Sequence, residues 1–414
     1  MAIPQRAGTR EACNRGTGAG WITPDGTWSV RLGEPALDAL FQALHNDERE
    51  IIGPTVRNGA VVLAPITAVD DLPAGWHDTQ DAGHYRATRA GHRARFTHAV
   101  PAQGWKRFVH PPEERLWRAH RPVAGGLILE DDAPPQKRRA FLGVRSCDLA
   151  ALAVLDRVLA GPDQPDPAYA QRRRDTLVIS VDCGTPAASC FCASMDTGPA
   201  ARDGFDLALV ELVTDDDGAP VYLARPGSPA GAALLERLPG CPASEADQAA
   251  ATDQLDHAVT VQTRALPPDI RGVLAGATDS RHWDDVAARC LACGNCTLSC
   301  PTCFCATVED TTSLDGHTAE RWRRWSSCFT EAFSYIHGGA VRGGRGTRYR
   351  QWITHKLSAW HDQFGGSGCV GCGRCITWCP VGIDITAEAA ALGAEAHARP
   401  VASARGASTP PPHA

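Results

Sequence analysis

Two cysteine runs with the same internal spacing lie in the last third of the chain. Each has the form Cys-x2-Cys-x2-Cys-x3-Cys-Pro; the first contains Cys290, Cys293, Cys296 and Cys300, and the second contains Cys369, Cys372, Cys375 and Cys379. An iron–sulfur cube needs four thiolates, and the x2 spacing lets one short loop present three of them. The two runs therefore predict two [4Fe-4S] clusters.

The fourth cysteine of such a run usually binds the other cluster of the pair. The expected ligands are Cys290, Cys293, Cys296 and Cys379 for cluster one, and Cys369, Cys372, Cys375 and Cys300 for cluster two. Zinc knuckles or plain buried thiols are the alternatives, because zinc also binds Cys-x2-Cys pairs. A zinc ion has no use for the third cysteine of each run or for the proline that follows it. The runs thus predict a protein that carries electrons.

A second group of cysteines lies in the N-terminal half, where we expect two strands to end. Cys147 follows one predicted strand, and Cys183, Cys190 and Cys192 follow the next. Neighbouring parallel strands deliver their carboxyl ends to one edge of a sheet, where sites are usually built. Four cysteines from two such loops are enough for a third [4Fe-4S] cluster. The alternatives are a zinc site or small buried side chains, as free cysteines often are.

Three more cysteines, Cys303, Cys305 and Cys328, lie near the first run. We expect the first two to continue the helical turn beyond Cys300, and all three to serve as packing or as a spare thiol.

Basic residues gather between positions 321 and 356, where Glu331 is the single acid. They are Arg321, Arg323, Arg324, Arg342, Arg345, Arg348, Arg350 and Lys356. Positive charge near an anionic cluster stabilises its reduced form and raises its potential. A solvated helix face or a docking patch for an acidic partner explains any one of them equally well. The chain has three lysines, Lys106, Lys137 and Lys356, against 41 lysines and arginines together; we attribute this to codon composition.

Length, charge and composition limit the remaining classes of function. With 414 residues the chain is long enough for two domains, and its net charge of -6 gives no sign of a nucleic-acid partner. Its 17 cysteines have metal-ligand spacings rather than a disulfide pattern, which favours a reducing cytoplasm. We find no stretch of about 20 apolar residues and no apolar N-terminal segment, so we expect no membrane span, signal peptide or anchor.

The sequence lacks the motifs that would indicate a catalytic site. No Gly-x-Gly-x-x-Gly follows a predicted strand, and no paired Cys-x2-Cys motifs stand at the two ends of the chain to bind nickel. We therefore expect no catalytic residues, and a chain that is non-catalytic alone but acts as one component of an oxidoreductase complex.

The N-terminal pattern predicts an α/β or α+β domain over residues 26–266. A helix over 34–46 precedes a hairpin over 50–67 that turns at Asn58-Gly59. Strands over 140–145, 176–183 and 207–214 follow, with a helix over 149–159 between the first two. A further helix over 244–266 ends at Pro267-Pro268, a plausible domain boundary.

Residues 267–386 are expected to form an all-helical domain that holds the two clusters. One aromatic stripe predicts a helix from Trp322 to Ile336, and another predicts a helix from Tyr349 to Phe364. We expect residues 1–25 to be disordered. A helix is expected to end within residues 387–414 and to be followed by a disordered tail, because residues 403–414 have the sequence SARGASTPPPHA.

Five segments together resemble one family. They are GVRSCDLAALAVLD (143–156), DCGTPAASCFCASMDTGP (182–199), DLALVEL (206–212), CLACGNCTLSCPTCFC (290–305), and RYRQWITHK with GCVGCGRCITWCPVGIDI within 348–385. The family is the iron–sulfur beta subunit of cytoplasmic sulfhydrogenases, which are NAD(P)-linked [NiFe] hydrogenases. The iron–sulfur component of anaerobic sulfite reductase, its A component, is a close relative.

The resemblance implies a protein that relays electrons through [4Fe-4S] clusters. Its partners would be the small and large subunits of a [NiFe] hydrogenase and a [2Fe-2S] subunit that binds FAD and NAD(P). Two alternatives stay open: the A component of an anaerobic sulfite reductase, and a dicluster adaptor like the C component of heterodisulfide reductases. The adaptors usually lack a large N-terminal α/β domain.

Overall fold

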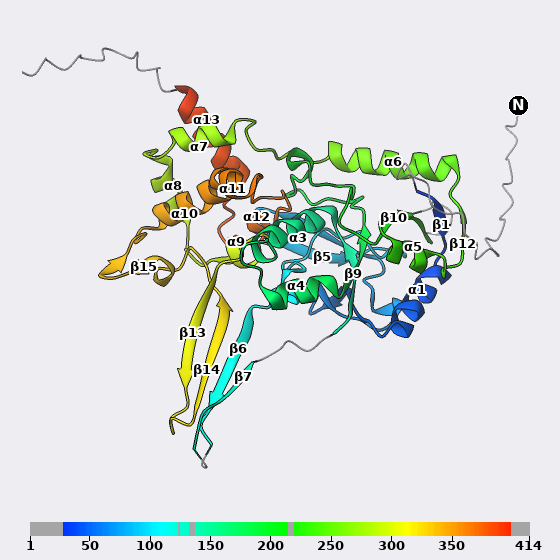
Figure 1. Cartoon of the computed structure of the whole chain (residues 1–414). Helices are drawn as coiled ribbons and strands as arrows, with labels where there is room; N and C mark the ends of the chain where they lie inside the picture. The colour runs from blue at the N-terminus through cyan, green and yellow to red at the C-terminus, as the bar shows by residue number, and fades with distance from the viewer. Residues whose placement is uncertain (1–27, 123–124, 132–136, 214–218, 399–414) are drawn as a thin grey trace, which may run out of the picture.

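An eight-stranded mixed sheet forms the centre of the N-terminal half in the computed structural model, which describes residues 28–122, 125–131, 137–213 and 219–398 (Figure 1). The strand order is β12-β1-β11-β10-β9-β8-β2-β3. The strands are β1 (Val30–Leu32), β2 (Glu50–Arg57), β3 (Ala60–Pro65), β8 (Arg139–Val144), β9 (Thr176–Val181), β10 (Leu207–Val213), β11 (Pro220–Pro226) and β12 (Gly240–Pro242).

The middle of this sheet is parallel and buried. Strands β2, β8, β9 and β10 pair in parallel, and every residue of β9 is buried. Strands buried on both faces read as continuous apolar runs, which is why β8, β9 and β10 could be predicted. The predicted hairpin is also confirmed: β2 and β3 pair antiparallel across Asn58 and Gly59, both at positive φ.

Helices cover both faces of the sheet. Helix α1 (Pro35–Asn46) packs on one face, and helix α3 (Ser146–Leu159) packs on the other through its leucines. The remaining helices of this half are α2 (Lys106–Val109), α4 (Pro167–Arg174), α5 (Pro229–Leu235) and α6 (Glu245–Thr260). The two-faced layering confirms the predicted α/β character of this half.

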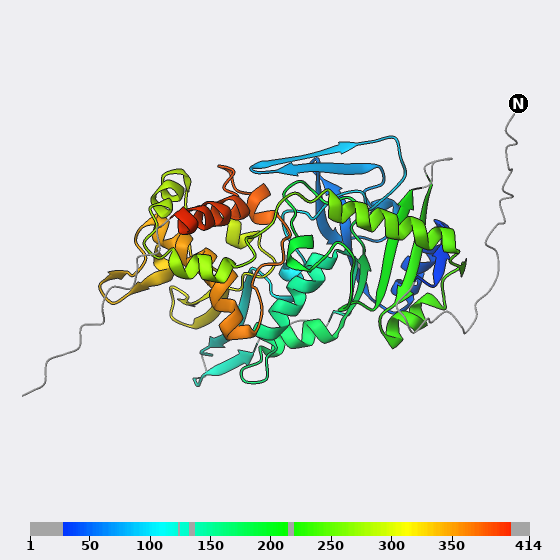
Figure 2. The same ribbon diagram turned by 90° about the horizontal axis from the view of Figure 1, so that it is seen from above.

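A separate hairpin reaches from the N-terminal half to the second cysteine run. Strands β4 (Trp76–Asp81) and β5 (His84–Arg89) form it, and Figure 2 shows it lying beside α12 (Arg374–Thr377). The backbone N–H of Gly83, at its tip, donates to the carbonyl oxygen of Ile376 at 3.1 Å. The ring of Tyr85 lies 5.0 Å from that of Trp378. The hairpin therefore ties the two halves together.

Short helices surround the cysteine runs. They are α7 (Ile270–Gly276), α8 (His282–Arg289), α9 (Asn295–Leu298), α10 (Arg345–Thr354), a π-helical turn (His355–Ala359), α11 (Trp360–Phe364), α12 and α13 (Ile385–Ala398). The aromatic stripe predicted from Tyr349 to Phe364 is confirmed as the continuous segment from α10 to α11, with Trp352 and Trp360 buried. It ends at Gly365, which adopts the left-handed conformation.

The prediction of an all-helical C-terminal domain is wrong, because this region contains β-strands. Strands β13 (Ala306–Thr312) and β14 (Thr318–Trp325) form a hairpin, and Trp322 and Trp325 lie on β14 rather than on a helix. A second, shorter pair is formed by β15 (Tyr335–Ile336) and β16 (Gly339–Ala340), and β15 occupies the end of the same predicted helix. The i, i+3 spacing of the tryptophans suggested a helix, but the strand is stabilised by pairing with a segment distant in the sequence.

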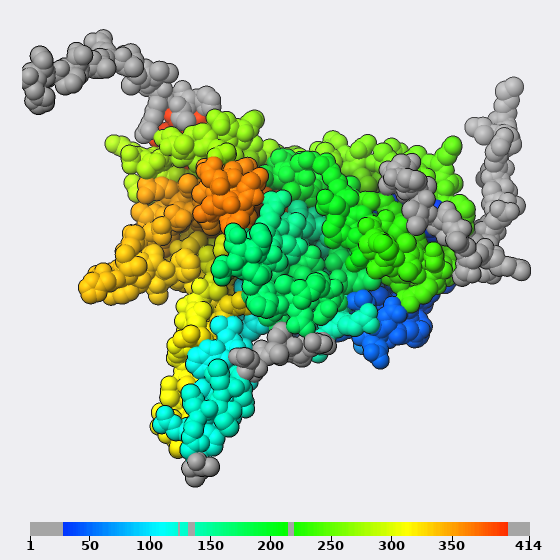
Figure 3. Space-filling view, in the orientation of Figure 1, coloured from blue at the N-terminus to red at the C-terminus, as the bar shows by residue number. Residues whose placement is uncertain are grey.

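That distant segment is β6 (Glu113–His120), which pairs antiparallel with β14 and with β7 (Ile128–Asp131). The sheet β13-β14-β6-β7 projects from the body as an arm (Figures 1 and 3, yellow and cyan). It takes strands from both sides of the predicted boundary at residues 266 and 267.

The predicted disordered segments lie largely outside the described residues, which begin at 28 and end at 398. Within the described ranges, no helix combines the length and the apolar character needed to span a membrane.

Candidate metal centre

The two cysteine runs adopt the same backbone geometry. In the first run, Cys290 follows the end of α8, and both Ala292 and Gly294 adopt positive φ. The N–H of Ala292 points at Cys290 Sγ, with an N···S distance of 3.3 Å. In the second, Gly371 has positive φ, and its N–H donates to Cys369 Sγ at 3.5 Å. The repeated spacing is therefore a repeated loop with its amides turned toward sulfur.

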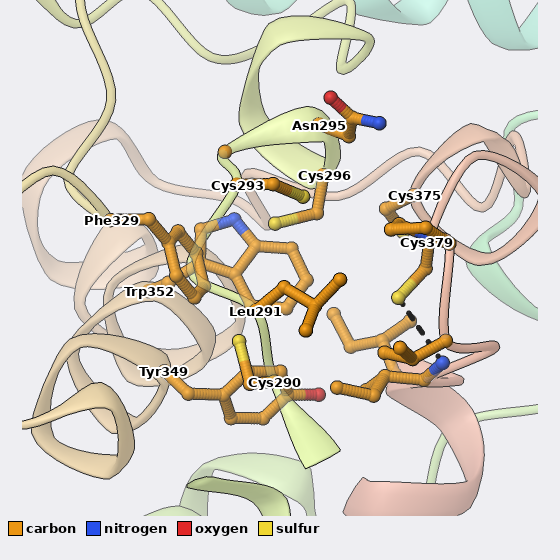
Figure 4. Close-up of a pocket in the computed structure, with 15 residues that line it drawn as sticks. Cys290, Leu291, Cys293, Asn295, Cys296, Phe329, Tyr349, Trp352, Cys375 and Cys379 are labelled. Atoms are coloured by element: carbon orange, nitrogen blue, oxygen red, sulfur yellow. Dashed lines mark hydrogen bonds between the residues drawn. The ribbon is translucent and has the colours of Figure 1, made fainter.

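Three thiols of the first run line a pocket together with two cysteines of the second run (Figure 4). The lining cysteines are Cys290, Cys293, Cys296, Cys379 and Cys375, and the walls include Leu291, Phe329, Tyr349, Trp352, Val381, Ile383 and Ile385. Cys379 Sγ accepts the N–H of Ile383 at 3.3 Å, drawn as the dashed line in Figure 4. Cys379 thus faces the first run, where the fourth ligand of cluster one was predicted.

Cys300 lies in turn beside the cysteines of the second run. Burial raises the pKa of Cys369 to about 12, and the thiols of Cys372 and Cys300 add to the rise. Burial also raises the pKa of Cys375 well above its usual value, with Cys369, Cys372 and Cys300 contributing. The neutral form is therefore favoured at Cys369 and Cys375, whereas a hydrogen bond with Cys303 and the charge of Lys356 lower the pKa of Cys300 well below its usual value.

The thiols predicted to bind cluster one line the wall of a pocket rather than converge on a point. Among the described residues, no three or more Cys, His, Asp or Glu side chains are arranged to hold a single metal ion. In a cubane each thiolate binds a separate iron corner, so its ligands line the wall of a cavity. The first set, with apolar walls and amides directed at sulfur, fits such a group.

A buried lysine contacts the sulfur of Cys300. Lys356 Nζ lies 3.4 Å from Cys300 Sγ, 3.0 Å from Thr302 Oγ1 and 3.1 Å from the carbonyl oxygen of Gly368. Burial alone would lower the pKa of Lys356, but the neighbouring thiols of Cys300 and Cys303 outweigh it and raise the pKa well above its usual value. No sequence motif relates these two positions, so this contact could not be predicted.

The other basic residues between 321 and 356 have different positions. Arg321, Arg323 and Arg324 lie on the arm and form ion pairs with acidic residues there or on neighbouring elements. Arg345 donates to the carbonyl oxygen of Cys290 at 2.8 Å, and Arg348 to that of Phe329 at 2.9 Å. The predicted basic cluster is therefore split, with three arginines on the arm and two that hold backbone carbonyls of residues lining the first pocket.

The N-terminal cysteines are brought together at one edge of the large sheet. Cys147 lies in the first turn of α3 after β8, and Cys183 follows β9. All four, Cys147, Cys183, Cys190 and Cys192, are at most 8% exposed. Burial raises the pKa of Cys192 to about 12, and the thiol of Cys183 adds to the rise. Gly198 leaves no room for a side chain here, since a Cβ would lie 2.9 Å from Cys192 Sγ.

This loop packs directly on the second run. The N–H of Phe191 donates to the carbonyl oxygen of Gly371 at 2.8 Å. Cys190 Sγ lies 3.8 Å from the carbonyl oxygen of Cys372. A Cβ on Gly371 would lie 2.6 Å from the backbone of Phe191 and Cys192. The glycine of the second run is therefore needed for close approach as well as for its positive φ.

The remaining thiols lie next to these sets. The segment 303–305 is irregular rather than helical, which corrects the expected helical turn beyond Cys300. Cys303 forms a side-chain hydrogen bond with Cys300, which raises the pKa of Cys303 well above its usual value. Cys305 and Cys328 line a second pocket, beside Trp352 and Arg342.

Comparison with known proteins identifies the type of domain that contains the two cysteine runs. The model of a family described as a 4Fe-4S dicluster domain matches residues 289–383. Sulfhydrogenase 2 subunit beta from Pyrococcus furiosus is 35% identical over 284 residues, which cover 67% of this chain and 79% of that protein. No solved structure matches the chain. A chain with these two cysteine runs and this extent of identity belongs to the sulfhydrogenase beta subunit family.

Proposed function

We propose that this protein is the electron-transfer subunit of a cytoplasmic, multi-subunit hydrogenase. Cluster one would be held by Cys290, Cys293, Cys296 and Cys379, and cluster two by Cys369, Cys372, Cys375 and Cys300. The observation that carries the proposal is the position of Cys379, which comes from the second run but lines the pocket of the first. The sequence identity with a sulfhydrogenase beta subunit supports the type of complex.

The cluster itself supplies one-electron transfer when bound. The rings of Phe329, Tyr349 and Trp352 form a buried wall of the first pocket, whereas Cys293 is exposed. Amide donors such as the N–H groups of Ala292 and Ile383 would stabilise negative charge on sulfur. Cys375 lines the first pocket although it is assigned to cluster two, so the two clusters would be neighbours.

A third cluster, held by Cys147, Cys183, Cys190 and Cys192, forms part of the proposal. Its support is the burial of all four thiols and their packing on the second run. A centre there would extend the relay from cluster two into the N-terminal half, so that the three sites follow one another through the protein.

Membership of a sulfhydrogenase subunit family supports a multi-subunit complex, and the partners are part of the proposal. We propose a [NiFe] hydrogenase pair of small and large subunits on one side, and a [2Fe-2S] subunit that binds FAD and NAD(P) on the other. Of the alternative complexes, the sulfite reductase would be recognised by its own partner proteins in a co-purification from the native source.

The first test is the colour of the anaerobically purified chain. Iron bound by thiolates gives broad visible absorption that bleaches with dithionite, whereas zinc leaves a protein colourless. A colourless chain with a full complement of zinc would contradict the proposal. The second test is activity: the chain alone, with native metals, should neither oxidise hydrogen nor reduce NAD(P).

A further inference from the structure

The three lysines of the chain are not distributed as a codon bias would place them. Lys106 and Lys356 are both 5% exposed and lie near Cys300 and Cys303, whereas Lys137 is on the surface. Lysine is strongly hydrated and is rarely buried without a partner. Two buried lysines in one place therefore indicate an anionic partner.

Lys356 has a sulfur atom as part of its hydrogen-bonding shell. Its Nζ contacts Cys300 Sγ, Thr302 Oγ1 and the carbonyl oxygen of Gly368 at 3.0–3.4 Å. Thr302 Oγ1 itself lies 3.1 Å from Cys300 Sγ and donates to the same carbonyl oxygen at 2.7 Å. The ammonium group is thus held in place by two neutral oxygens, and Cys300 is the group that carries negative charge as a thiolate.

The corresponding cysteine of cluster one has a different environment. Cys379 Sγ accepts a backbone N–H, from Ile383, and this donor carries no net charge. The other loop contacts match in the two runs, at Cys290 and Cys369. The fourth ligands therefore differ in their donors, because a charged ammonium lies against Cys300 and a neutral amide lies against Cys379.

We propose that Lys356 raises the reduction potential of the cluster that Cys300 helps to bind. This inference rests on the proposed function, because it requires a redox centre at the second run. Reduction adds negative charge to a largely buried site, and burial opposes that step. A fixed cation at a ligand sulfur favours the reduced form, so Lys356 offsets the effect of burial.

Lys106 lies close by but has a different role. Its Nζ donates to the carbonyl oxygen of Cys303 at 2.8 Å and lies 3.8 Å from the centre of the Trp325 ring. Because it contacts a carbonyl and a ring rather than sulfur, its removal should shift the potential less than removal of Lys356. The three lysines thus form a graded series: Lys356 contacts a ligand sulfur, Lys106 lies nearby without contacting one, and Lys137 lies on the surface.

The test is an anaerobic potentiometric titration of the full chain, followed by electron paramagnetic resonance. Lys356→Met removes the charge and keeps a side chain of similar length. At the wild-type midpoint, the ratio of reduced to oxidised cluster two should fall about tenfold or more, and tenfold corresponds to about 59 mV for a one-electron couple. Lys356→Arg should restore most of the shift, and Lys137→Met should leave every step unchanged.

The reduction step whose midpoint potential shifts in Lys356→Met must be the step that Cys300→Ser also perturbs. This comparison assigns the shifted step to cluster two. An unchanged potential in Lys356→Met, an equal shift in all steps, or an equal shift in Lys356→Arg would overturn the inference. Lys356→Gln serves as the second neutral variant, and loss of about four irons in both neutral variants would show a structural role instead. The proposed function fails separately, if the wild-type chain binds no iron.

Discussion

Arg374 and Asp148 form a bidentate ion pair in which the two N–O distances are 2.7 and 2.9 Å and neither side chain is more than 2% exposed. Arg374 lies in the second cysteine run, between Cys372 and Cys375, and Asp148 follows Cys147 in α3. One buried ion pair thus joins the run that would bind cluster two to the helix that carries a ligand of the proposed third cluster.

Asp148→Asn should destabilise the protein strongly. The substitution leaves the guanidinium of Arg374 buried without a counter-charge, and breaking one side of a buried pair costs about 3–5 kcal/mol. Denaturant unfolding of the anaerobic protein measures the change. Asp310→Asn, which breaks an exposed pair with Arg321, is the control and should have little effect. Equal effects of the two substitutions would contradict the structural role of Arg374.

Gly371→Ala should separate the second run from the cysteine loop at 189–192. Gly371 has φ of 63°, and a Cβ would lie 2.6 Å from the backbone of Phe191 and Cys192. Gly365→Ala is a matched control, because Gly365 has φ of 75° but open space around its Cβ position. We expect a lower unfolding midpoint and lower iron content for Gly371→Ala than for Gly365→Ala. Equal loss in both variants would show that φ alone matters.

Stability should fall as the pH drops below about 6.5, partly because of His98. Burial, with a contribution from Arg145, lowers the pKa of His98 to about 3. Below the unfolded pKa of about 6.5 the unfolded chain binds a proton that the folded chain does not. The free energy of unfolding therefore falls by about 1.4 kcal/mol per pH unit between about pH 6.5 and 3 for this group.

His98→Gln removes that contribution, so its unfolding midpoint should depend less on pH than that of the wild type. The dependence should not vanish, because burial also lowers the pKa of His110 to about 3. Unfolding curves of both proteins between about pH 7 and 5 decide the point. Parallel pH dependences would show that His98 is already protonated, or free to leave its site, in the folded chain.

Short-range patterns account for what could be predicted from the sequence. The buried strands β8, β9 and β10, the hairpin at Asn58-Gly59 and the cysteine runs each depend on neighbours within about ten residues. The parallel pairing of β8 and β9 then brings Cys147 and Cys183 to one edge of the sheet, as the predicted order of strand, helix and strand indicated.

Long-range pairing accounts for what could not be predicted. Strand β14 pairs with β6 with Arg321 opposite Trp117, two segments separated by most of the N-terminal half. The charged residues on both strands obscure the alternation of apolar and polar residues that is typical of a strand. The spacing of Trp322 and Trp325 is instead typical of a helix. The contact between Lys356 and Cys300 has the same origin, since no local pattern relates the two positions.

Substitution of the fourth cysteine of each run tests whether that cysteine binds the cluster of the other run. Cys379→Ser should alter cluster one, because Cys379 lines the pocket with Cys290, Cys293 and Cys296. Cys300→Ser should alter cluster two instead. Electron paramagnetic resonance of the reduced variants distinguishes the two clusters, since Cys293→Ser and Cys372→Ser supply a reference spectrum for each. Damage confined to the cluster of the mutated residue's own run would show that the ligands are not exchanged.

Counting iron tests the third cluster. Two cubanes require about eight irons per chain and three require about twelve. We expect about twelve in the wild type and a loss of about four in Cys190→Ser, because Cys190 is buried with Cys183 and Cys192 and lies against the second run. Cys328→Ser is the control, since Cys328 lines a different pocket and belongs to none of the three proposed ligand sets. A fully loaded wild type with eight irons, unchanged in Cys190→Ser, would leave the N-terminal cysteines as packing residues. A loss of about eight irons in that variant would mean that cluster two depends on the loop at 189–192, and the intact spectrum of cluster one would then separate that dependence from general unfolding.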